Sequence, residues 1–182
     1  QISTGSHHGC GVEPSGSIQC WGNDAYGQSS PPEGTFTEVR AGGWHTCALT
    51  DAGSATCWGS DSTGQASPPP GTFTTLSAFN NHNCGITASD TVSCWGWNDY
   101  GQTDSPGGTF IAVDAGGRHS CGITSTGTVE GWGANDHGQS TPPSLEFALL
   151  SVGEWHNCGV TTDGTVECWG SDSSGQCTPP EL

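Results

Sequence analysis

The sequence predicts an all-β protein, a five-bladed β-propeller built from 37-residue repeats. Three observations lead to this prediction. The motif Trp-Gly-x-x-x-x-Gly-Gln occurs five times, and its copies begin 37 residues apart, at Trp21, Trp58, Trp95, Trp132 and Trp169. Short apolar segments alternate with Gly, Pro, Asp and Ser, which is typical of strands and turns. No stretch of the chain shows helical periodicity.

Each repeat contains three strand-like segments, which are clearest in the second repeat. The expected strands there are FTEVRA (36–41), HTCALT (45–50) and SATCWG (54–59), and the turn between the last two lies at Asp51–Gly53. A sheet of this size cannot bury both of its faces alone, so the repeats must pack against one another.

The repeats predict a single propeller domain over residues 1–182. They run approximately over 4–40, 41–77, 78–114, 115–151 and 152–182, and residues 1–3 complete the last one. The chain is three residues short of five full periods, so it ends close to the point in the repeat at which it begins. We therefore expect a ring closed where the termini meet, which leaves only short, protected edges. An open stack, or part of a larger ring, is the alternative.

Paired cysteines are expected to form disulfide bonds within the blades. In a hairpin centred on Ala52, Cys47 and Cys57 lie directly opposite each other. Opposed residues have Cα atoms about 4.5–5.5 Å apart, within disulfide range. The predicted disulfides are Cys10–Cys20, Cys47–Cys57, Cys84–Cys94 and Cys158–Cys168. Buried free thiols are the alternative.

The fourth repeat departs from this pattern. Cys121 faces Gly131, and an additional cysteine, Cys177, stands where the other repeats have Ser, Ala or Thr. One lost partner and one new cysteine predict a Cys121–Cys177 bridge between neighbouring blades. Two free thiols, or pairing with another chain, are the alternatives.

Charge and composition exclude several classes of function. The chain has a net charge of −16 and only two basic residues, Arg40 and Arg118, so a phosphate backbone would repel it. Nucleic-acid binding is excluded, and no apolar run is long enough for a membrane-spanning helix. The absence of Met and the abundance of Cys predict a secreted protein whose signal peptide has been removed.

The repeat A-G-G-x-H-x-C-A-L…D-x-G…C-W-G-x-D-x-x-G-Q resembles that of the regulator of chromosome condensation family. The resemblance is strongest to its bacterial secreted members, among which are propellers that inhibit β-lactamases, and it covers essentially the whole chain. It implies a propeller that binds another protein through loop aromatic residues. This sequence departs from the family, whose members usually have seven blades and often lack the paired cysteines. The WD40 propeller fits less well, because Trp-Gly stands where its Trp-Asp signature would be.

Residues identical in every repeat are expected to be structural. They include a histidine at five equivalent positions, the five tryptophans of the repeated motif, an Asp or Asn that shapes the following loop, and a Gln. A ring of imidazoles that holds a cation is the alternative for the histidines, but no Cys-x-x-Cys spacing supports a metal site. We expect no metal and no cofactor.

Function is better sought at positions where the repeats differ. These positions lie at strand–loop junctions and hold Trp, Tyr and Arg, the residues enriched at binding hot spots. The candidate ligand-binding residues are His7, Tyr26, Trp44, Asn81, Trp97, Tyr100, Arg118, His137 and Trp155. That these aromatic residues only cover the core is the alternative.

The sequence favours a binding protein over an enzyme. There is no Gly-x-Ser-x-Gly or His-Glu-x-x-His motif, and the absence of Lys excludes P-loop and Schiff-base chemistry. Because the candidate residues differ between repeats, we expect one asymmetric face that recognises a protein partner, with inhibition as one possible role. A carbohydrate-binding lectin is the first alternative, because Trp44 matches Trp155 and Tyr26 matches Tyr100 in position. A structural extracellular surface or filament protein is the second.

Overall fold

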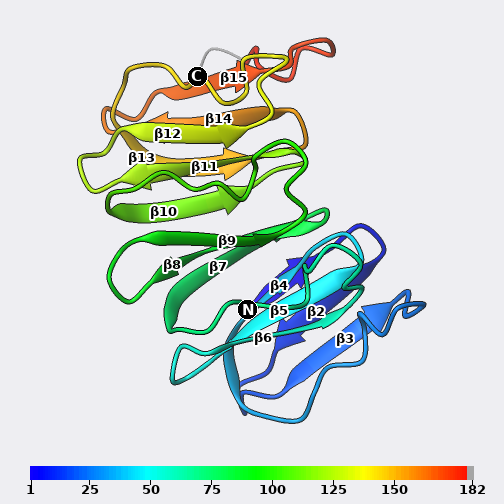
Figure 1. The fold of residues 1–182 in the computed structure, drawn as a ribbon. Helices are drawn as coiled ribbons and strands as arrows, with labels where there is room; N and C mark the ends of the chain where they lie inside the picture. The colour runs from blue at the N-terminus through cyan, green and yellow to red at the C-terminus, as the bar shows by residue number, and fades with distance from the viewer. Residues whose placement is uncertain (180–182) are drawn as a thin grey trace.

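Fifteen strands and no helix make up the computed structural model, which describes residues 1–179. They form five antiparallel three-stranded sheets, each in sequential order, which we number blades 1 to 5 along the chain (Figure 1). The blades are β1(Ile2–Thr4), β2(His8–Val12), β3(Ile18–Gly22); β4(Phe36–Ala41), β5(His45–Thr50), β6(Ala55–Gly59); β7(Phe73–Phe79), β8(His82–Thr87), β9(Val92–Gly96); β10(Phe110–Ala115), β11(His119–Thr124), β12(Val129–Gly133); and β13(Phe147–Val152), β14(His156–Thr161), β15(Val166–Gly170). Within the described residues, no helix could cross a membrane.

The expected strands of the second repeat agree with β4, β5 and β6 to within one residue. Gly53 has a φ of 77° in the turn between β5 and β6, a left-handed conformation that glycine adopts without strain. All-β architecture with five blades is thus confirmed.

A β-bulge shapes the first strand of blades 2 to 5. In β4 the pairing register shifts between Phe36 and Glu38. Side chains three residues apart normally point to opposite faces of a strand, and one extra residue brings them to the same face. Phe36 and Val39 are therefore both buried. β1 begins at Ile2, the equivalent of Val39, so the position equivalent to Phe36 falls before the first residue of this sequence.

The hydrophobic core lies between blades rather than within them. In the first junction, Cys10 and Ile18 of blade 1 pack with Phe36 and Val39 of blade 2. The three later junctions repeat this cluster around Phe73, Phe110 and Phe147. Full burial of one such Phe contributes roughly 1.5–3 kcal/mol to stability. Each blade therefore depends on its neighbour for a core.

Closure of the ring is not observed. Blades 1 and 5 lie at opposite ends of the stack in Figure 1. Trp21 is 51% exposed, whereas Trp95 of blade 3 is 7% exposed. In blade 1, Gly9 stands where Thr46 and its equivalents carry a polar side chain. Trp21, one of the five motif tryptophans expected to be structural, is not buried between blades.

The four predicted hairpin disulfides are present, with Cα–Cα distances of 4.0–4.1 Å. The predicted Cys121–Cys177 bridge is wrong, because both thiols are free. Cys121 is buried in the cluster between blades 4 and 5, whereas the Cys177 thiol lies in the last loop and donates to the Ser171 carbonyl at 3.2 Å. There is no room for a side chain at position 131, because the following loop packs against it: a Cβ on Gly131 would lie 2.9 Å from Cα of Ser140.

The hairpin disulfides stabilise a chain whose core is divided into small clusters. Each closes a short loop, which is worth about 3 kcal/mol in the chain-entropy account. We expect the double variant Cys47→Ser/Cys57→Ser to lose about this much, or about 6–12 °C in Tm. Thermal unfolding followed by circular dichroism measures the loss. An unchanged Tm would show that Cys47 and Cys57 are not bonded in solution.

Candidate functional site

One hydrogen-bond relay crosses each junction between blades and accounts for four of the five repeated histidines. His45 Nε2 lies 2.7 Å from Oδ1 of Asn83 in the next blade. The Asn83 amide donates at 2.9 Å to the backbone carbonyl of Gln65, and the Trp95 indole donates to that same carbonyl at 3.2 Å. Since the Asn83 oxygen can only accept, His45 carries its proton on Nε2. The equivalent relays are His8–Thr46–Gln28, His82–Ser120–Gln102 and His119–Asn157–Gln139.

These histidines are buried as neutral rings. Burial lowers the pKa of His45 to about 4 and that of His82 to about 3, and it also lowers the pKa values of His8 and His119. Each Nε2 is engaged by the next blade, and each Nδ1 is buried without a hydrogen-bond partner. Within residues 1–179, no group of three His, Cys, Asp or Glu side chains is placed to hold a metal ion.

The loop that follows the third strand of each blade carries Tyr26, Trp97, Tyr100 and His137, and it is fixed by two repeated contacts. Asp24 Oδ1 accepts the backbone N–H of Ser29 at 2.7 Å, a bond that spans five residues rather than the two of an Asx turn. Gln28 Oε1 accepts the backbone N–H of Tyr26 at 2.9 Å. Both contacts recur in the other four blades. The loop geometry is therefore uniform, and only the side chains on it differ.

A simple rule brings the candidate residues together. Three of the residues that precede a repeated histidine, Trp44, Arg118 and Trp155, each meet two variable residues of the preceding blade. In the first junction, the Trp44 ring centroid lies 4.7 Å from that of His7 and 5.6 Å from that of Tyr26. We call His7, Tyr26 and Trp44 the N-terminal aromatic cluster.

Blades 3 to 5 carry a second group, which we call the arginine–aromatic cluster: Trp97, Tyr100, Arg118, His137 and Trp155. The Arg118 guanidinium carbon lies 4.7 Å from the Tyr100 ring centroid, 4.9 Å from that of Trp155 and 5.7 Å from that of Trp97. Arg118 also donates to the Tyr100 hydroxyl at 2.7 Å. His137 meets Trp155 edge-on, with ring centroids 5.8 Å apart.

Arg118 forms no ion pair among residues 1–179, whereas Arg40 pairs with Glu38 at 2.7 Å. Aromatic rings contact the Arg118 guanidinium instead. Its N–H groups that make no hydrogen bond within the described residues are therefore available to a ligand.

Asn81 is the one candidate outside both clusters. It occupies the equivalent position on blade 3, where its backbone carbonyl accepts the N–H of Trp97 at 2.9 Å. No hydrogen bond is formed by its side chain within the described part of the chain. The structure therefore groups eight of the nine candidate residues and leaves Asn81 between the two clusters.

Trp97 breaks a structural contact that sequence reasoning missed. In blades 1 and 2 the amide of the repeated Gln donates to Asn23 Oδ1 at 3.1 Å and to Ser60 Oγ at 3.3 Å. Trp97 and Ala134 stand at the equivalent positions of blades 3 and 4 and offer no acceptor. Nε2 of Gln102 and of Gln139 is accordingly buried without a partner. An unmet buried donor costs about 1–3 kcal/mol, so Trp97 occupies its position at the expense of stability.

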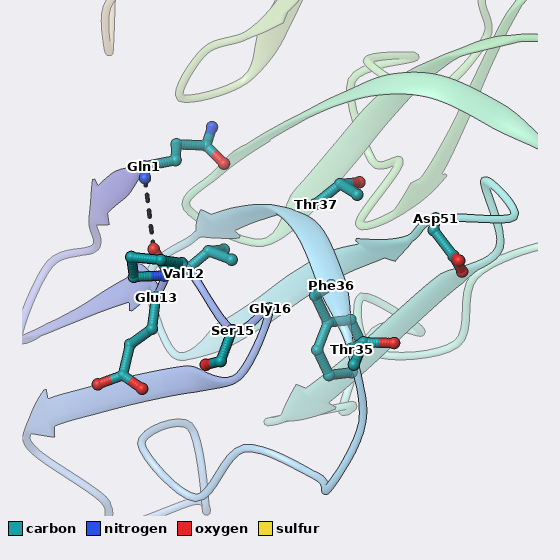
Figure 2. Close-up of a pocket in the computed structure, with 10 residues that line it drawn as sticks. Gln1, Val12, Glu13, Ser15, Gly16, Thr35, Phe36, Thr37 and Asp51 are labelled. Atoms are coloured by element: carbon teal, nitrogen blue, oxygen red, sulfur yellow. Dashed lines mark hydrogen bonds between the residues drawn. The ribbon is translucent and has the colours of Figure 1, made fainter.

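A groove lies at the opposite end of the blades. It has a volume of about 710 Å³, and Figure 2 shows its lining, which includes Glu13, Ser15, Thr35, Phe36 and Asp51. These residues come from the hairpin turn of blade 1, from the start of β4 and from the turn after β5. The groove is open, its lining is mixed polar and apolar, and it contains none of the candidate residues.

Comparison with protein families identifies the repeat. The model described as "Regulator of chromosome condensation (RCC1) repeat" matches residues 1–28, 36–65, 76–102, 110–139 and 147–176. These five segments agree with the five blades. No curated protein sequence matches the chain.

Solved structures give the same architecture. The ectodomain of the Physcomitrella patens receptor kinase CR4 matches with a TM-score of 0.82 and 25% identity, over 93% of this chain and 52% of that one. The ectodomain of the Arabidopsis thaliana receptor kinase ACR4 matches with a TM-score of 0.76 and 28% identity, over 93% and 62%. Prp20p from Saccharomyces cerevisiae, at 14% identity and a TM-score of 0.82 over 99% and 59%, shares the fold. The chain thus spans between 52% and 62% of the length of these proteins.

The neutral histidines predict a loss of stability in acid. An unfolded histidine binds a proton below about pH 6.5, whereas folded His82 binds one only near pH 3. Stability contributed by His82 is complete above pH 6.5 and decreases by up to about 1.4 kcal/mol per pH unit as the pH falls toward 3. Urea unfolding between pH 7 and pH 4.5 measures this slope.

The variant His82→Gln isolates this contribution, and its slope should be smaller by about that amount. The comparison is needed because burial raises the pKa of Asp114, which opposes the histidine effect in the same acid range. Equal slopes in the two proteins would contradict a buried neutral His82.

The buried Gln139 amide, which has no hydrogen-bond acceptor, predicts a stabilising substitution. Ala134→Ser places a hydroxyl where Ser60 has one, so we expect a gain of about 1 kcal/mol as Gln139 Nε2 finds an acceptor. Ser60→Ala is the matched control, and it should lose a similar amount. Urea unfolding of both variants tests the contact. No gain in the first and no loss in the second would show that water already satisfies these amides.

Proposed function

Since the chain belongs to the regulator of chromosome condensation (RCC1) repeat family, we propose that it is a non-enzymatic, extracellular module that recognises a protein partner. The face that binds is the composite surface formed by the N-terminal aromatic cluster and the arginine–aromatic cluster. The observation that carries this proposal is the placement of eight variable residues, rich in Trp, Tyr and Arg, at one end of the blades, on the loops after the third strands and in the turns between the first and second strands. Such residues dominate binding energy at protein interfaces.

The asymmetry of the two clusters favours a macromolecular partner over repeated small sites. Trp44 and Trp155 occupy equivalent positions, but Trp44 meets Tyr26 and His7, whereas Trp155 meets Arg118 and His137. A protein that binds several copies of one small ligand should present the same neighbours at each site. Here each cluster presents different chemistry, as one extended interface requires.

The net charge of the chain indicates which class of protein partner it binds. A chain with a net charge of −16 attracts a partner with a basic surface and accelerates the encounter with it. The exposed aromatic faces of Tyr26 and Tyr100 can accept Lys or Arg side chains of that partner by cation–π contact. Occupation of the partner's surface in this way is also how such a module would act as an inhibitor.

The similar proteins agree with this proposal. Two of them are ectodomains of receptor kinases, and Prp20p is described by its binding to Gsp1p and histones. An extracellular location also suits four disulfides, which persist in oxidising compartments.

Carbohydrate binding is the second candidate, and one observation favours it. A pocket of about 410 Å³ beside Trp155 is lined also by His137, Ser171 and Asp172. An aromatic face that a sugar ring can stack on, next to a hydroxyl and a carboxylate that bond its hydroxyl groups, is a plausible glycan site.

The test is to capture partners from the native extracellular surroundings and to compare the intact protein with two variants. We expect the triple variant Trp44→Ala/Trp97→Ala/Trp155→Ala to lose capture and to weaken affinity for the identified partner by at least about tenfold. Arg118→Lys keeps the charge but removes the planar stacking, so it should also weaken binding.

Ile111→Ser is the matched control, because Ile111 is exposed but lies on β10, away from both clusters. It should bind normally. Undiminished binding by the folded triple variant would exclude this face, and binding to a glycan array that depends on Trp155 alone would identify a lectin instead.

A further inference from the structure

We propose that Arg118 determines the specificity of the binding face by pairing with a carboxylate of the protein partner, an Asp or Glu side chain that lies within a basic surface. This pairing rests on the function proposed above, because the partner must reach the arginine–aromatic cluster. Arg118 is the one residue of the two clusters that carries a permanent charge, so it can select a ligand group by charge.

Side chains of the neighbouring blades fix the Arg118 guanidinium before a partner arrives. Arg118 lies in the turn between β10 and β11 of blade 4. The ring centroid of Tyr100, on the loop after β9 of blade 3, lies 4.7 Å from the guanidinium carbon, and that of Trp155, in the turn before β14 of blade 5, lies 4.9 Å from it. Contact on both sides restricts a long, flexible side chain, so less conformational entropy is lost when a ligand binds.

The edge of the guanidinium that best fits a carboxylate is unoccupied. Nη1 of Arg118 donates to the Tyr100 hydroxyl at 2.7 Å. Nε and Nη2, whose N–H bonds lie side by side on another edge, make no hydrogen bond or ion pair with residues 1–179. Two parallel N–H groups match the two oxygens of a carboxylate, and such bidentate pairs are among the strongest hydrogen bonds in proteins. Arg118 is partly exposed, so a ligand can reach it.

Arg40 shows what this edge of an arginine binds within the same chain. Nε and Nη2 of Arg40 both lie 2.7 Å from Oε1 of Glu38, so a carboxylate occupies the edge that is unoccupied in Arg118. The sequence has 18 acidic residues, so carboxylates are abundant, and yet Arg118 pairs with none that the structure describes. The carboxylate that completes Arg118 is therefore expected from another molecule.

The fold itself does not require a cation at this position. Asn81 is the equivalent of Arg118 in blade 3, and its side chain makes no hydrogen bond among the residues that the structure describes. The His45–Asn83–Gln65 relay nevertheless joins blades 2 and 3 beside it. A role in joining the blades thus does not account for Arg118.

The charge of the rest of the chain determines the surroundings of that carboxylate. A net charge of −16 repels an isolated acidic ligand and attracts a basic surface. At physiological salt, charges farther away than about 8 Å are largely screened, whereas a paired carboxylate lies within hydrogen-bond distance of Arg118. A carboxylate flanked by Lys side chains meets both conditions, because the chain and the exposed Tyr100 ring attract the cations while Arg118 attracts the carboxylate.

Nuclear magnetic resonance of the arginine side chains tests the proposal with two blocked peptides as probes. One is Lys-Lys-Glu-Lys-Lys, and the other has Gln in place of Glu. The chain contains only two arginines, so its ¹H–¹⁵N spectrum has one Nε signal from each. Arg40, already paired with Glu38, is the internal control. Ile111→Ser is the control variant, because Ile111 lies on β10 away from the cluster.

We expect the Glu peptide to shift the Arg118 Nε signal and to bind at least about threefold more tightly than the Gln peptide. Attraction by net charge alone would give the opposite order, because the Gln peptide is the more positive of the two. Arg118→Gln should lose the preference for Glu. Arg118→Lys should lose most of it, because an ammonium group offers no parallel pair of donors. The Arg40 signal should not move, and Ile111→Ser should behave as the unaltered protein.

Equal binding of the two peptides, or tighter binding of the Gln peptide, would overturn the proposal. An Arg118 signal that responds to glucuronate and not to the Glu peptide would also overturn it, because the carboxylate would then belong to an acidic sugar. Capture of a partner that depends on the three tryptophans, together with equal binding of the peptides, would reject the carboxylate pairing alone. Undiminished capture by the folded triple tryptophan variant would instead reject the binding face itself.

Discussion

The structure depends on one point of contact, the backbone carbonyl of the repeated glutamine. At each junction this carbonyl accepts a hydrogen bond from the tryptophan indole of the next blade and another from its Thr, Asn or Ser side chain, which in turn accepts from a buried histidine. The phenylalanine of the next blade fills the apolar space of the same junction. Because a three-stranded sheet of this composition has no core of its own, blades are stable only where this combined contact is made.

Because of this constraint, the residues of each repeat that maintain the structure differ from those available to bind a partner. The histidine, glutamine, motif tryptophan and loop Asp or Asn are all engaged in the junction or the loop, so they cannot contact a ligand without loss of stability. The positions beside them are free to differ, and they place aromatic residues and Arg118 at one end of the blades. Because Trp97 offers no acceptor, the Gln102 amide is buried without a hydrogen-bond partner. Such a local loss of stability is typical of binding surfaces.

The repeat period alone predicted the blade count, the strand positions and the four hairpin disulfides, because all of these are local to one repeat. Contacts between repeats were harder to predict. Chain length suggested a closed ring, whereas blades 1 and 5 lie at opposite ends of the stack in the structure. The prediction of a Cys121–Cys177 bridge was wrong for a similar reason, since one thiol is buried in a junction and the other lies in a loop.

The candidate residues were identifiable as variable positions, but their division into two clusters follows from contacts between Tyr26 and Trp44, and between Tyr100 and Arg118, across blade boundaries.

The most direct test of the junction contact is the protonation state of the histidine rings, read from long-range ¹H–¹⁵N correlations of the imidazole nitrogens near pH 5. Burial lowers the pKa of His45 to about 4 and that of His82 to about 3, so both rings should be neutral, with the relay proton on Nε2, at a pH where an exposed histidine is charged. Two neutral rings with the proton on Nε2 would establish the relay in solution. Imidazolium signals from these residues, with titration near pH 6.5, would contradict it and with it the account of how the blades are joined.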